Sequence, residues 1–358
     1  MAYPRGMARI AVVTSHPPFA EGGHLVIARA LVDALAERGH EATVMLTPQN
    51  RFGRQGAAYL ATWLTDVGRA HDGGRIDQVI SLRFPSYAVR HERHVCWINH
   101  RMREYYDQWP RFRRSLSRRG ALKEGVRRRI LHAADRYLLT RNVTRLFAQS
   151  RTIQARLARW GRIAADVVHP PAPPRPYRCD GYGDHVLVVS RLTPLKRVDL
   201  VIDALREPAA SSVRCVILGD GEEHPSLAAR IEEHGLGGRV TLRGAVAEAD
   251  LLDHLARCRA VCFPAAQEDY GLVTVEAFAS AKAVVTCRDS GGPAELVADG
   301  VNGRVVAPEA PALAAALGAL MDDAPLAERL GAAARRQSDA MTWDRALERL
   351  LLPELRVQ

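Results

Sequence analysis

Two glutamates eight residues apart, Glu268 and Glu276, stand in a segment whose chemistry suits a phosphorylated ligand that carries hydroxyl groups. Gly271 lies between them and argues against one continuous helix, so the segment predicts a strand, a loop with Glu268 and a helix from about Leu272. The free backbone N–H groups at the start of that helix would point into the loop. They belong to Gly271, Leu272 and Val273, and they form an anion site suited to a diphosphate.

The carboxylates themselves need a different partner. A diphosphate repels a carboxylate, so Glu268 and Glu276 should accept hydrogen bonds from hydroxyl groups. A sugar nucleotide offers hydroxyls on both sides of its diphosphate. The alternative, an acid that serves the dipole at a helix start, explains either glutamate alone but not both together with the glycine turn.

Two cations, Arg191 and Lys196, follow an apolar strand expected over 185–190. Breaking a bond to an anomeric carbon leaves negative charge on the departing diphosphate, and two fixed cations stabilise that charge more than the ground state. The alternative is a pair of solvated side chains. Their place at the opening of a second domain, at the carboxyl end of a strand, favours the functional interpretation.

The elements that would position these residues occur twice, because both halves of the chain begin with a strand, a loop, a helix and a second strand. These elements are expected at 9–14, 25–38 and 41–46, and again at 185–190, 198–205 and 214–218. The strands are continuously apolar, which is typical of parallel sheets covered on both faces. The expected fold class is therefore α/β, with two Rossmann-like, doubly wound parallel-sheet domains.

A proline-rich stretch at 170–176, followed by Gly181 and Gly183, separates the halves. Proline at this density cannot continue a helix or a central strand, so we expect a linker and a domain boundary within 170–183. Two such domains would face each other across a cleft at the carboxyl ends of their strands, where ligands of doubly wound sheets bind.

The sequence Phe-Pro-x-x-x-Glu-Asp-Tyr-Gly-Leu-Val-x-Val-Glu-Ala at 263–277 resembles glycosyltransferase family 4, whose members are retaining enzymes of the GT-B fold. The similarity continues through 290–297, 299–303 and 189–199. It covers most of the second half of the chain and, more weakly, the first half. The combination of these motifs is specific, although each one alone is a weak signal.

This resemblance implies roles for particular residues. Glu268 would hold hydroxyls of the donor sugar, Glu276 those of the ribose, and Arg191 and Lys196 the diphosphate. The remaining donor-binding candidates of the segment are Tyr270, Gly271, Leu272 and Val273. The resemblance also implies an acceptor domain over 1–172, a donor-nucleotide domain over 173–342, and a final helix at about 343–358 that returns to the first domain.

In the first half, Gly22 and Gly23 follow the first strand. A glycine pair lets a backbone approach a ligand closely, and the family has one near the donor phosphate and the acceptor; a simple tight turn is the alternative. His100 stands just past a strand end, in a stretch similar to His-x-Pro-x-Arg-x-x-Trp-Asp of mannosyltransferase-like members. The proline is lost here and Tyr106 replaces the tryptophan. His100 is a candidate catalytic residue, and a packed histidine is the alternative.

The net charge of +10 is concentrated in one region. Residues 101–162 hold eighteen basic side chains and four acidic ones, an excess of fourteen positive charges. Such a run is either a solvated helical surface or a surface for an anionic membrane or a phosphorylated acceptor. We expect no nucleic acid partner, because no binding motif accompanies the charge.

Composition bears on cofactors and on location. The six scattered cysteines are expected to be buried free thiols, and the absence of an Asp-x-Asp motif argues against a required metal on the diphosphate. No cofactor is therefore expected besides the donor substrate. No apolar run is long enough to span a membrane. The simplest interpretation is therefore a cytoplasmic protein, with peripheral contact at the inner membrane face left open.

Together these features predict a retaining glycosyltransferase that transfers a hexose-type sugar from a nucleoside diphosphate sugar. The motif wording favours a GDP-sugar such as GDP-mannose, and a UDP-sugar stays open. The acceptor is open among a glycan, a lipid-linked glycan and a small metabolite. Two alternatives remain: a GT-B sugar-nucleotide epimerase, and a non-catalytic basic protein that binds a membrane or RNA on a nucleotide-binding scaffold.

Overall fold

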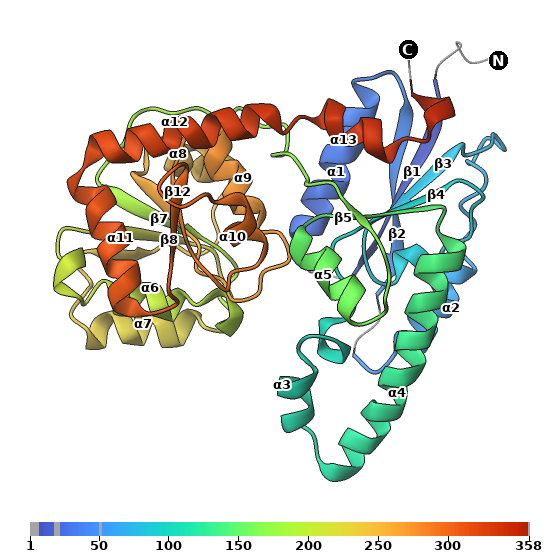
Figure 1. Cartoon of the computed structure of the whole chain (residues 1–358), viewed down its shortest axis with the longest axis horizontal. Helices are drawn as coiled ribbons and strands as arrows, with labels where there is room; N and C mark the ends of the chain where they lie inside the picture. Colours follow the sequence, from blue (N-terminus) through green and yellow to red (C-terminus); the bar gives the residue numbers. More distant parts are fainter. Residues whose placement is uncertain (1–6, 18–21, 50–51, 357–358) are drawn as a thin grey trace. The chain divides into compact units, whose positions relative to one another are not determined.

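The computed structural model describes residues 7–17, 22–49 and 52–356. They form two compact units. The N-terminal unit comprises the chain up to Pro173 together with the segment from Trp343 onward, and the C-terminal unit comprises Pro174–Thr342. Each unit is a parallel sheet covered by helices (Figure 1).

The N-terminal sheet has the strand order β2-β1-β3-β4-β5-β6, and all its neighbours pair in parallel. Its strands are β1 (Arg9–His16), β2 (Glu41–Pro48), β3 (Gln78–Ser81), β4 (His94–Ile98), β5 (Arg145–Ala148) and β6 (Asp166–Val167). The central strands β3 and β4 are buried along their length, as expected in a sheet that helices cover on both faces.

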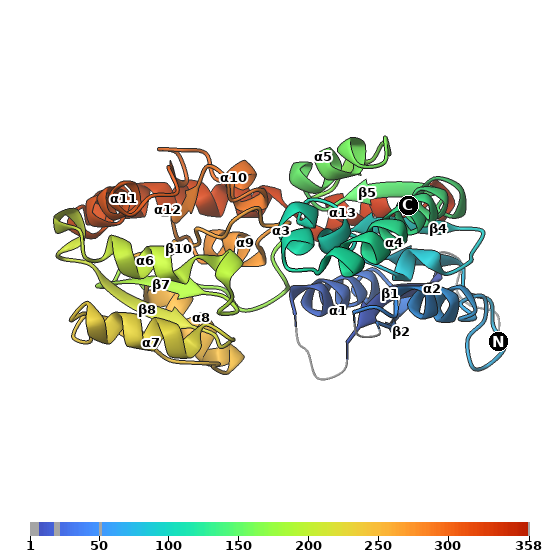
Figure 2. The same ribbon diagram turned by 90° about the horizontal axis from the view of Figure 1, so that it is seen from below.

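The described residues of this unit include the helices α1 (Gly23–Ala36), α2 (Gln55–Trp63), α3 (Trp109–Arg114), α4 (Arg118–Tyr137), α5 (Arg151–Arg159) and α13 (Trp343–Leu350). Short 3-10 turns are η1 (Ser86–Ala88), η2 (Arg103–Tyr105) and η6 (Pro353–Leu355), and a π-helical turn, η3 (Leu138–Asn142), continues directly from α4. The helices α3 and α4 project together from the sheet (Figures 1 and 2).

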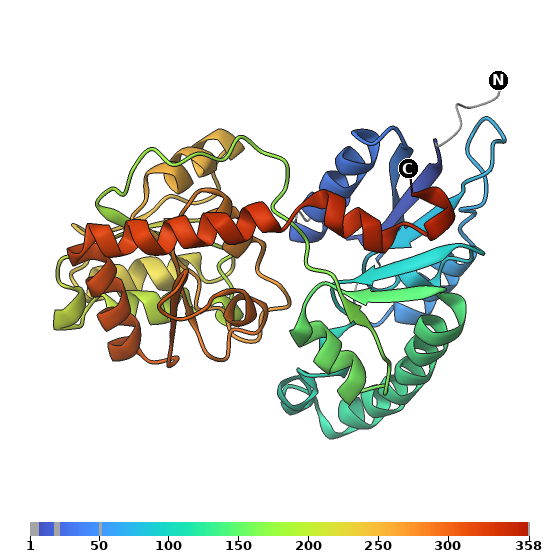
Figure 3. The same cartoon turned by 45° about the horizontal axis from the view of Figure 1, so that its top comes forward.

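The last helix, α13, lies beside α1 (Figure 3). Arg38, just after α1, pairs with Asp344 of α13 at 2.5 Å. The Gln78 amide of β3 donates to the Leu350 carbonyl at 2.8 Å and accepts from the Leu352 N–H at 2.9 Å. These bonds fix the segment 344–352 to the rest of the N-terminal unit. The helix ends at Leu350, earlier than the expected 358, and Pro353 begins the short turn η6 instead.

The C-terminal sheet has the order β12-β11-β10-β7-β8-β9. Its strands are β7 (His185–Val189), β8 (Arg214–Leu218), β9 (Val240–Leu242), β10 (Ala260–Cys262), β11 (Val284–Cys287) and β12 (Gly303–Val306). Its helices are α6 (Val198–Ala204), α7 (His224–Glu233), α8 (Glu248–Arg257), α9 (Leu272–Ala279), α10 (Gly292–Leu296), α11 (Ala310–Asp322) and α12 (Ala324–Ala340). Two short turns are η4 (Pro194–Lys196) and η5 (Pro208–Ala210). The helix α6 packs against both α7 and α11, and α9 packs against α12.

Both sheets are doubly wound and parallel, which confirms the predicted fold class. Among the described residues, none of the helices is both long enough and apolar enough to span a bilayer.

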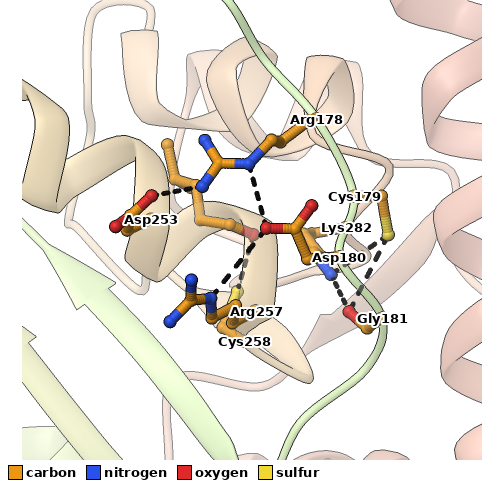
Figure 4. Close-up of polar contacts among 9 residues, drawn as sticks. Arg178, Cys179, Asp180, Gly181, Asp253, Arg257, Cys258 and Lys282 are labelled. Atoms are coloured by element: carbon orange, nitrogen blue, oxygen red, sulfur yellow. Dashed lines mark hydrogen bonds and ion pairs between the residues drawn. The ribbon is translucent and has the colours of Figure 1, made fainter.

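The segment that begins the C-terminal unit has no helix or strand and is fastened to that unit by polar contacts (Figure 4). Arg178 forms ion pairs with Asp253 and Asp180, the latter at 2.9 Å. The fully buried Lys282 donates to the Gly181 carbonyl and lies 3.3 Å from the Cys179 sulfur. Cys179 is exposed, whereas the other five cysteines are buried. The prediction of buried thiols is thus wrong for Cys179, because it lies in this irregular surface segment.

Candidate functional site

The strand order of the C-terminal sheet reverses between β7 and β10. In doubly wound sheets, ligands bind outside the carboxyl ends of the two strands at such a reversal. The strand β7 ends at Val189 and β10 ends at Cys262. The loop with Arg191 and Lys196 and the loop with Glu268 therefore start from the same place, and the two segments singled out from the sequence meet there.

The contact between these loops is an ion pair. The Lys196 ammonium lies 2.6 Å from Glu268 Oε2, and their side chains are only 14% and 21% exposed. The same ammonium lies 5.1 Å from the centre of the Phe263 ring. The sequence assigned the two residues to different parts of a ligand, but the structure shows that they are partners. A diphosphate at Lys196 must share that cation with Glu268.

Arg191 differs from Lys196. Its side chain is exposed, and it forms no ion pair with any residue that the structure describes. The site thus holds one cation that is already neutralised and one that faces solvent. An anion placed here would meet Arg191 at full charge, whereas Lys196 becomes available only as Glu268 finds another partner.

The start of α9 lies in the same loop system. Gly271 has φ 77°, and a Cβ there would lie 2.6 Å from the Pro293 Cγ, so only glycine fits. No side chain caps the helix. The helix begins at Leu272, as predicted from the sequence, and the N–H groups of Leu272 and Val273 precede its first intrahelical bond. Their role as an anion site stays a prediction.

The loop after β11 holds the backbone of Glu268 in place. The Glu268 N–H donates to the Ser290 carbonyl at 2.9 Å, and its carbonyl accepts from the Gly292 N–H at 3.0 Å. A Cβ on Gly291, whose φ is 71°, would lie 2.4 Å from the Glu268 carbonyl oxygen. The backbone of Tyr270 packs equally closely on Gly292. The segment at 290–292, noted in the sequence only as part of a resemblance, therefore shapes the loop that carries Glu268.

Two non-glycine residues with left-handed backbone flank the ion pair, Arg197 at φ 52° and Gln267 at φ 49°. Asp289 holds both. Its carboxylate accepts two bonds from the Arg197 guanidinium at 2.8 and 2.6 Å, and its carbonyl accepts the Gln267 N–H at 2.8 Å. A left-handed conformation costs such residues roughly 1–2 kcal/mol, and strain of this kind gathers at functional sites.

Glu276 lies in the second turn of α9 and is 5% exposed. Its Oε1 accepts from the Arg175 guanidinium at 2.5 Å and from the Tyr177 hydroxyl at 3.4 Å, while Oε2 accepts no bond from a described residue. Burial raises the pKa of Glu276, and Arg175 opposes that rise. One oxygen is thus fixed and the other can receive a ligand hydroxyl. Arg175 was missed in the sequence, because it stands among linker prolines.

The loop after β8 is a second feature that the sequence interpretation missed. A Cβ on Gly219 would lie 1.8 Å from the Ser190 carbonyl oxygen, and one on Gly221 would lie 2.3 Å from the Leu192 carbonyl oxygen. The Leu192 N–H donates to the Asp220 carbonyl at 2.9 Å. Gly219 and Gly221 allow this loop to lie directly against the loop of Arg191. The available signal was a Gly-Asp-Gly sequence after an apolar strand.

In the N-terminal unit the strand order reverses at β1 and β3, and Gly22 and Gly23 follow β1. Residues 18–21 of this loop lie outside the described residues. Gly22 is the N-cap of α1 with an extended backbone, φ −170°, and Gly23 is the first helical residue. The pair is thus part of a helix start without a side-chain cap, and Gly22 needs no positive φ.

His100 follows β4 by two residues and lines a pocket of this unit with Arg103, Tyr106 and Arg156. Its Nδ1 lies 2.9 Å from the Arg101 carbonyl oxygen, which can only accept, so Nδ1 carries the proton and Nε2 is an acceptor. Burial and the surrounding arginines lower the pKa of His100 to about 3. The imidazole is therefore neutral near pH 7 and suits hydrogen bonding to a hydroxyl better than proton abstraction.

Residues 180–337 match the family model of the glycosyl transferases group 1. The match lies within the C-terminal unit and includes Arg191, Lys196, Glu268 and Glu276. It supports the donor-half resemblance at the level of group 1 glycosyltransferases. Membership of family 4, the mannosyltransferase-like likeness and the roles of single residues stay predictions.

Curated relatives share the same half of the chain. The D-inositol 3-phosphate glycosyltransferase of Kineococcus radiotolerans is 34% identical over 185 residues, which cover 46% of this chain and 42% of that protein. The enzyme of the same name from Streptomyces griseus is 34% identical over 176 residues, 45% of this chain and 36% of that protein. The chain spans less than half the length of these relatives.

Solved structures match over nearly the whole chain. Anabaena HepE in complex with UDP and glucose has a TM-score of 0.70 at 19% identity, covering 95% of this chain and 97% of that one. Sucrose-phosphate synthase from Thermosynechococcus elongatus has a TM-score of 0.71 at 16% identity, with the same coverage. At such identity the likeness shows the fold. The fold is GT-B, as predicted.

Proposed function

We propose that this protein is a glycosyltransferase that uses a nucleoside diphosphate sugar as donor. The observation that carries the proposal is the Lys196–Glu268 pair at the strand-order reversal, beside the uncapped start of α9. A cation, helix N–H groups and a carboxylate thus meet where a doubly wound sheet binds its ligand. The match of residues 180–337 to the group 1 glycosyl transferases supports the same assignment.

Each of these polar groups would bind a different part of the donor. The diphosphate would lie on the N–H groups of Leu272 and Val273, with Arg191 and Lys196 as its cations. Oε2 of Glu276 would accept a ribose hydroxyl, because Arg175 already occupies Oε1. Glu268 would accept a hydroxyl of the sugar. This arrangement directs both glutamates to hydroxyl groups of the donor, although the diphosphate at Lys196 lies close enough to Glu268 for the two charges to repel each other.

The transfer we propose retains the configuration of the anomeric carbon. The acceptor hydroxyl attacks that carbon on the face from which the diphosphate departs, so a new C–O bond forms while the bond to the diphosphate breaks. The acceptor proton passes to a diphosphate oxygen. The products are the glycosylated acceptor and a nucleoside diphosphate, and the two cations stabilise the leaving charge without a required metal. Equal turnover with and without a chelator such as EDTA would test the metal-independent step.

Two observations bear on the donor base. The Glu-Asp-Tyr-Gly wording at 268–271 favours GDP by resemblance. The solved structures of HepE, in contrast, contain UDP, and one also contains glucose. We propose a hexose donor with GDP or UDP as carrier, and titrating both nucleotides into the same protein sample decides between them.

The central test is protection against thermal unfolding by GDP-, UDP-, ADP- and dTDP-sugars. The correct donor should raise the melting temperature of the wild type but not that of Glu276→Ala, because the ribose contact is lost. Glu248→Ala is the matched control, since Glu248 also binds Arg175 at 2.8 Å but is 58% exposed. If none of these donors distinguishes the wild type from Glu276→Ala, the proposed function is wrong.

A further inference from the structure

The outward surface of α4 carries a stripe of exposed apolar side chains. Leu122 is 74% exposed, Val126 52%, Ile130 63% and Tyr137 58%. At about 100° per residue, these four positions fall within an arc of roughly 80° on the helix. An ordered apolar stripe that faces solvent marks a surface for a partner.

Basic side chains border this stripe. Five of them are exposed and form no ion pair with a described residue: Arg118, Arg119, Lys123, Arg129 and Arg136. The preceding helix α3 adds Arg111, Arg113 and Arg114, which are also exposed. The outward surface of α4 therefore combines aliphatic side chains with a high density of positive charge.

The two acidic residues of α4 point the other way. Asp135 is 1% exposed and accepts hydrogen bonds from the hydroxyls of Tyr59, Tyr87 and Tyr106, the last two at 2.5 Å. Glu124 is 8% exposed and accepts from the Tyr105 hydroxyl at 2.7 Å. The helix thus buries its acids against tyrosines and keeps its outward surface free of negative charge.

We propose that this outward surface of α4 binds an anionic lipid bilayer, with the apolar stripe in the headgroup region and the flanking cations on lipid phosphates. A helix of this kind, apolar on one side and rich in Arg and Lys beside it, lies in the plane of a membrane surface. Each cation near an anionic bilayer strengthens binding about fivefold. The surface does not depend on the donor site, so this inference stands apart from the proposed function.

Other occupants fit the surface less well. A second copy of the chain would bring the same cations against each other around the stripe, which charge repulsion opposes. RNA would match the charge but not the aliphatic stripe, because bases stack on aromatic side chains and Tyr137 is the only aromatic residue in it. An anionic bilayer matches both the charge and the apolar side chains.

The test is co-sedimentation of the full chain with vesicles of phosphatidylcholine alone and with 30% phosphatidylglycerol. We expect binding only to the anionic vesicles. The double variant Leu122→Ser/Ile130→Ser and the double variant Arg129→Glu/Arg136→Glu should each weaken it at least tenfold. Matched controls elsewhere on the surface are Val301→Ser, at a site 57% exposed, and Arg329→Glu, and both should bind as the wild type does.

Three outcomes would overturn the inference. The first is that both double variants bind the anionic vesicles as tightly as the wild type does. The second is loss of binding in the charge variant but not in the stripe variant, combined with tighter binding to RNA than to vesicles, which would assign the surface to nucleic acid. The third is a dimer in solution that Leu122→Ser/Ile130→Ser dissociates, which would assign the stripe to a second copy. Thermal unfolding of each variant, unchanged because the substituted side chains are exposed, shows that its fold is intact.

Discussion

Replacing Glu268 by glutamine should tighten the binding of a bare nucleoside diphosphate. The affinity of the nucleoside diphosphate sugar, compared with that of the bare nucleotide, should fall. In the wild type, Glu268 already occupies Lys196 at 2.6 Å. A diphosphate that approaches Lys196 must compete with this carboxylate and is repelled by it. Glu268→Gln removes the negative charge and leaves the cation to the diphosphate.

The size of this effect follows from the geometry. A phosphate oxygen in contact with the Lys196 ammonium would lie roughly 5 Å from the Glu268 carboxylate. Two unit charges at that distance repel by ~0.8 kcal/mol in water and by ~3 kcal/mol at an effective dielectric constant of about 20. Both side chains are partly shielded, at 14% and 21% exposure. We therefore expect about 1–2 kcal/mol, or roughly 5–30-fold tighter binding of GDP or UDP.

The sugar conjugate should respond differently, because the variant loses a charged acceptor for the sugar hydroxyl. Such a hydrogen bond contributes about 1.5–3 kcal/mol. The ratio of the two dissociation constants, conjugate over bare nucleotide, should thus rise by roughly 10–150-fold. Isothermal titration of the wild type and the variant with both ligands measures this ratio.

Arg191→Ala is the matched control. Arg191 has no carboxylate partner among the described residues, so its loss should weaken the bare nucleotide and the conjugate to the same extent. If Glu268→Gln weakens both ligands equally, as Arg191→Ala does, then Glu268 holds no sugar hydroxyl and the pairing with Lys196 has no role in binding.

Four further predictions concern pH and stability. Donor affinity should decline on acidification, and the decline should begin at a higher pH than for an ordinary glutamate, because burial raises the pKa of Glu276 and the protonated form is a weaker acceptor. A titration of Glu276→Gln across pH 4–8 should lack this decline. Ionisation of buried Glu276 also lowers the free energy of unfolding as the pH rises through its pKa. The free energy of unfolding of Glu276→Gln, compared with that of the wild type, should therefore be higher at pH 7 than at pH 4, and urea unfolding at each pH measures this difference. Gly271→Ala should lower the free energy of unfolding by roughly 2–4 kcal/mol, since its φ of 77° and a Cβ only 2.6 Å from Pro293 both oppose a side chain, and a control Gly237→Ala, with open space around it, should not. Tyr87→Phe should cost about 1.5–3 kcal/mol by removing one donor to buried Asp135, and unchanged unfolding would contradict the bonding described here.

The meeting of the two donor loops could be predicted from the sequence for a physical reason. Continuous apolar strands followed by short loops and helices imply parallel sheets, and ligand sites of such sheets lie at the carboxyl ends of strands. The start of α9 at Leu272 followed from Gly271 in the same way. Local patterns set these features, so no knowledge of distant contacts was needed.

The contacts that define the site could not be predicted in this way. Arg175 reaches Glu276 across 101 residues, from a proline-rich segment in which nothing marks a guanidinium as a ligand of α9. The same holds for Asp289, which fixes Arg197 and Gln267 from the next loop. Such pairs depend on the register of the whole sheet, and one sequence carries no periodic signal for it.

The charge of residues 101–162 shows a similar limit. The excess of arginine is visible in the composition, but its meaning depends on which way α4 faces. That orientation is set by the tyrosines that bind Asp135, and two of them, Tyr59 and Tyr87, come from elements outside the basic run. A count of charges therefore identifies the region. Only the structure of α4, which the tyrosines hold through Asp135, shows that its cations lie on the outer surface and its acids are buried.

The pairing of Lys196 with Glu268 also gives the proposed reaction a direction. Before the donor binds, the pair is neutral and attracts a diphosphate only weakly. Once the sugar hydroxyls occupy Glu268, Lys196 can stabilise the charge that develops on the leaving diphosphate, so its stabilisation grows toward the transition state. After transfer, the glycosylated acceptor departs and Glu268 can pair with Lys196 again. The Glu268 carboxylate then repels the remaining nucleoside diphosphate and favours its release. Product inhibition by the nucleoside diphosphate should therefore be stronger in Glu268→Gln than in the wild type, and weaker inhibition would show that Glu268 does not compete for Lys196.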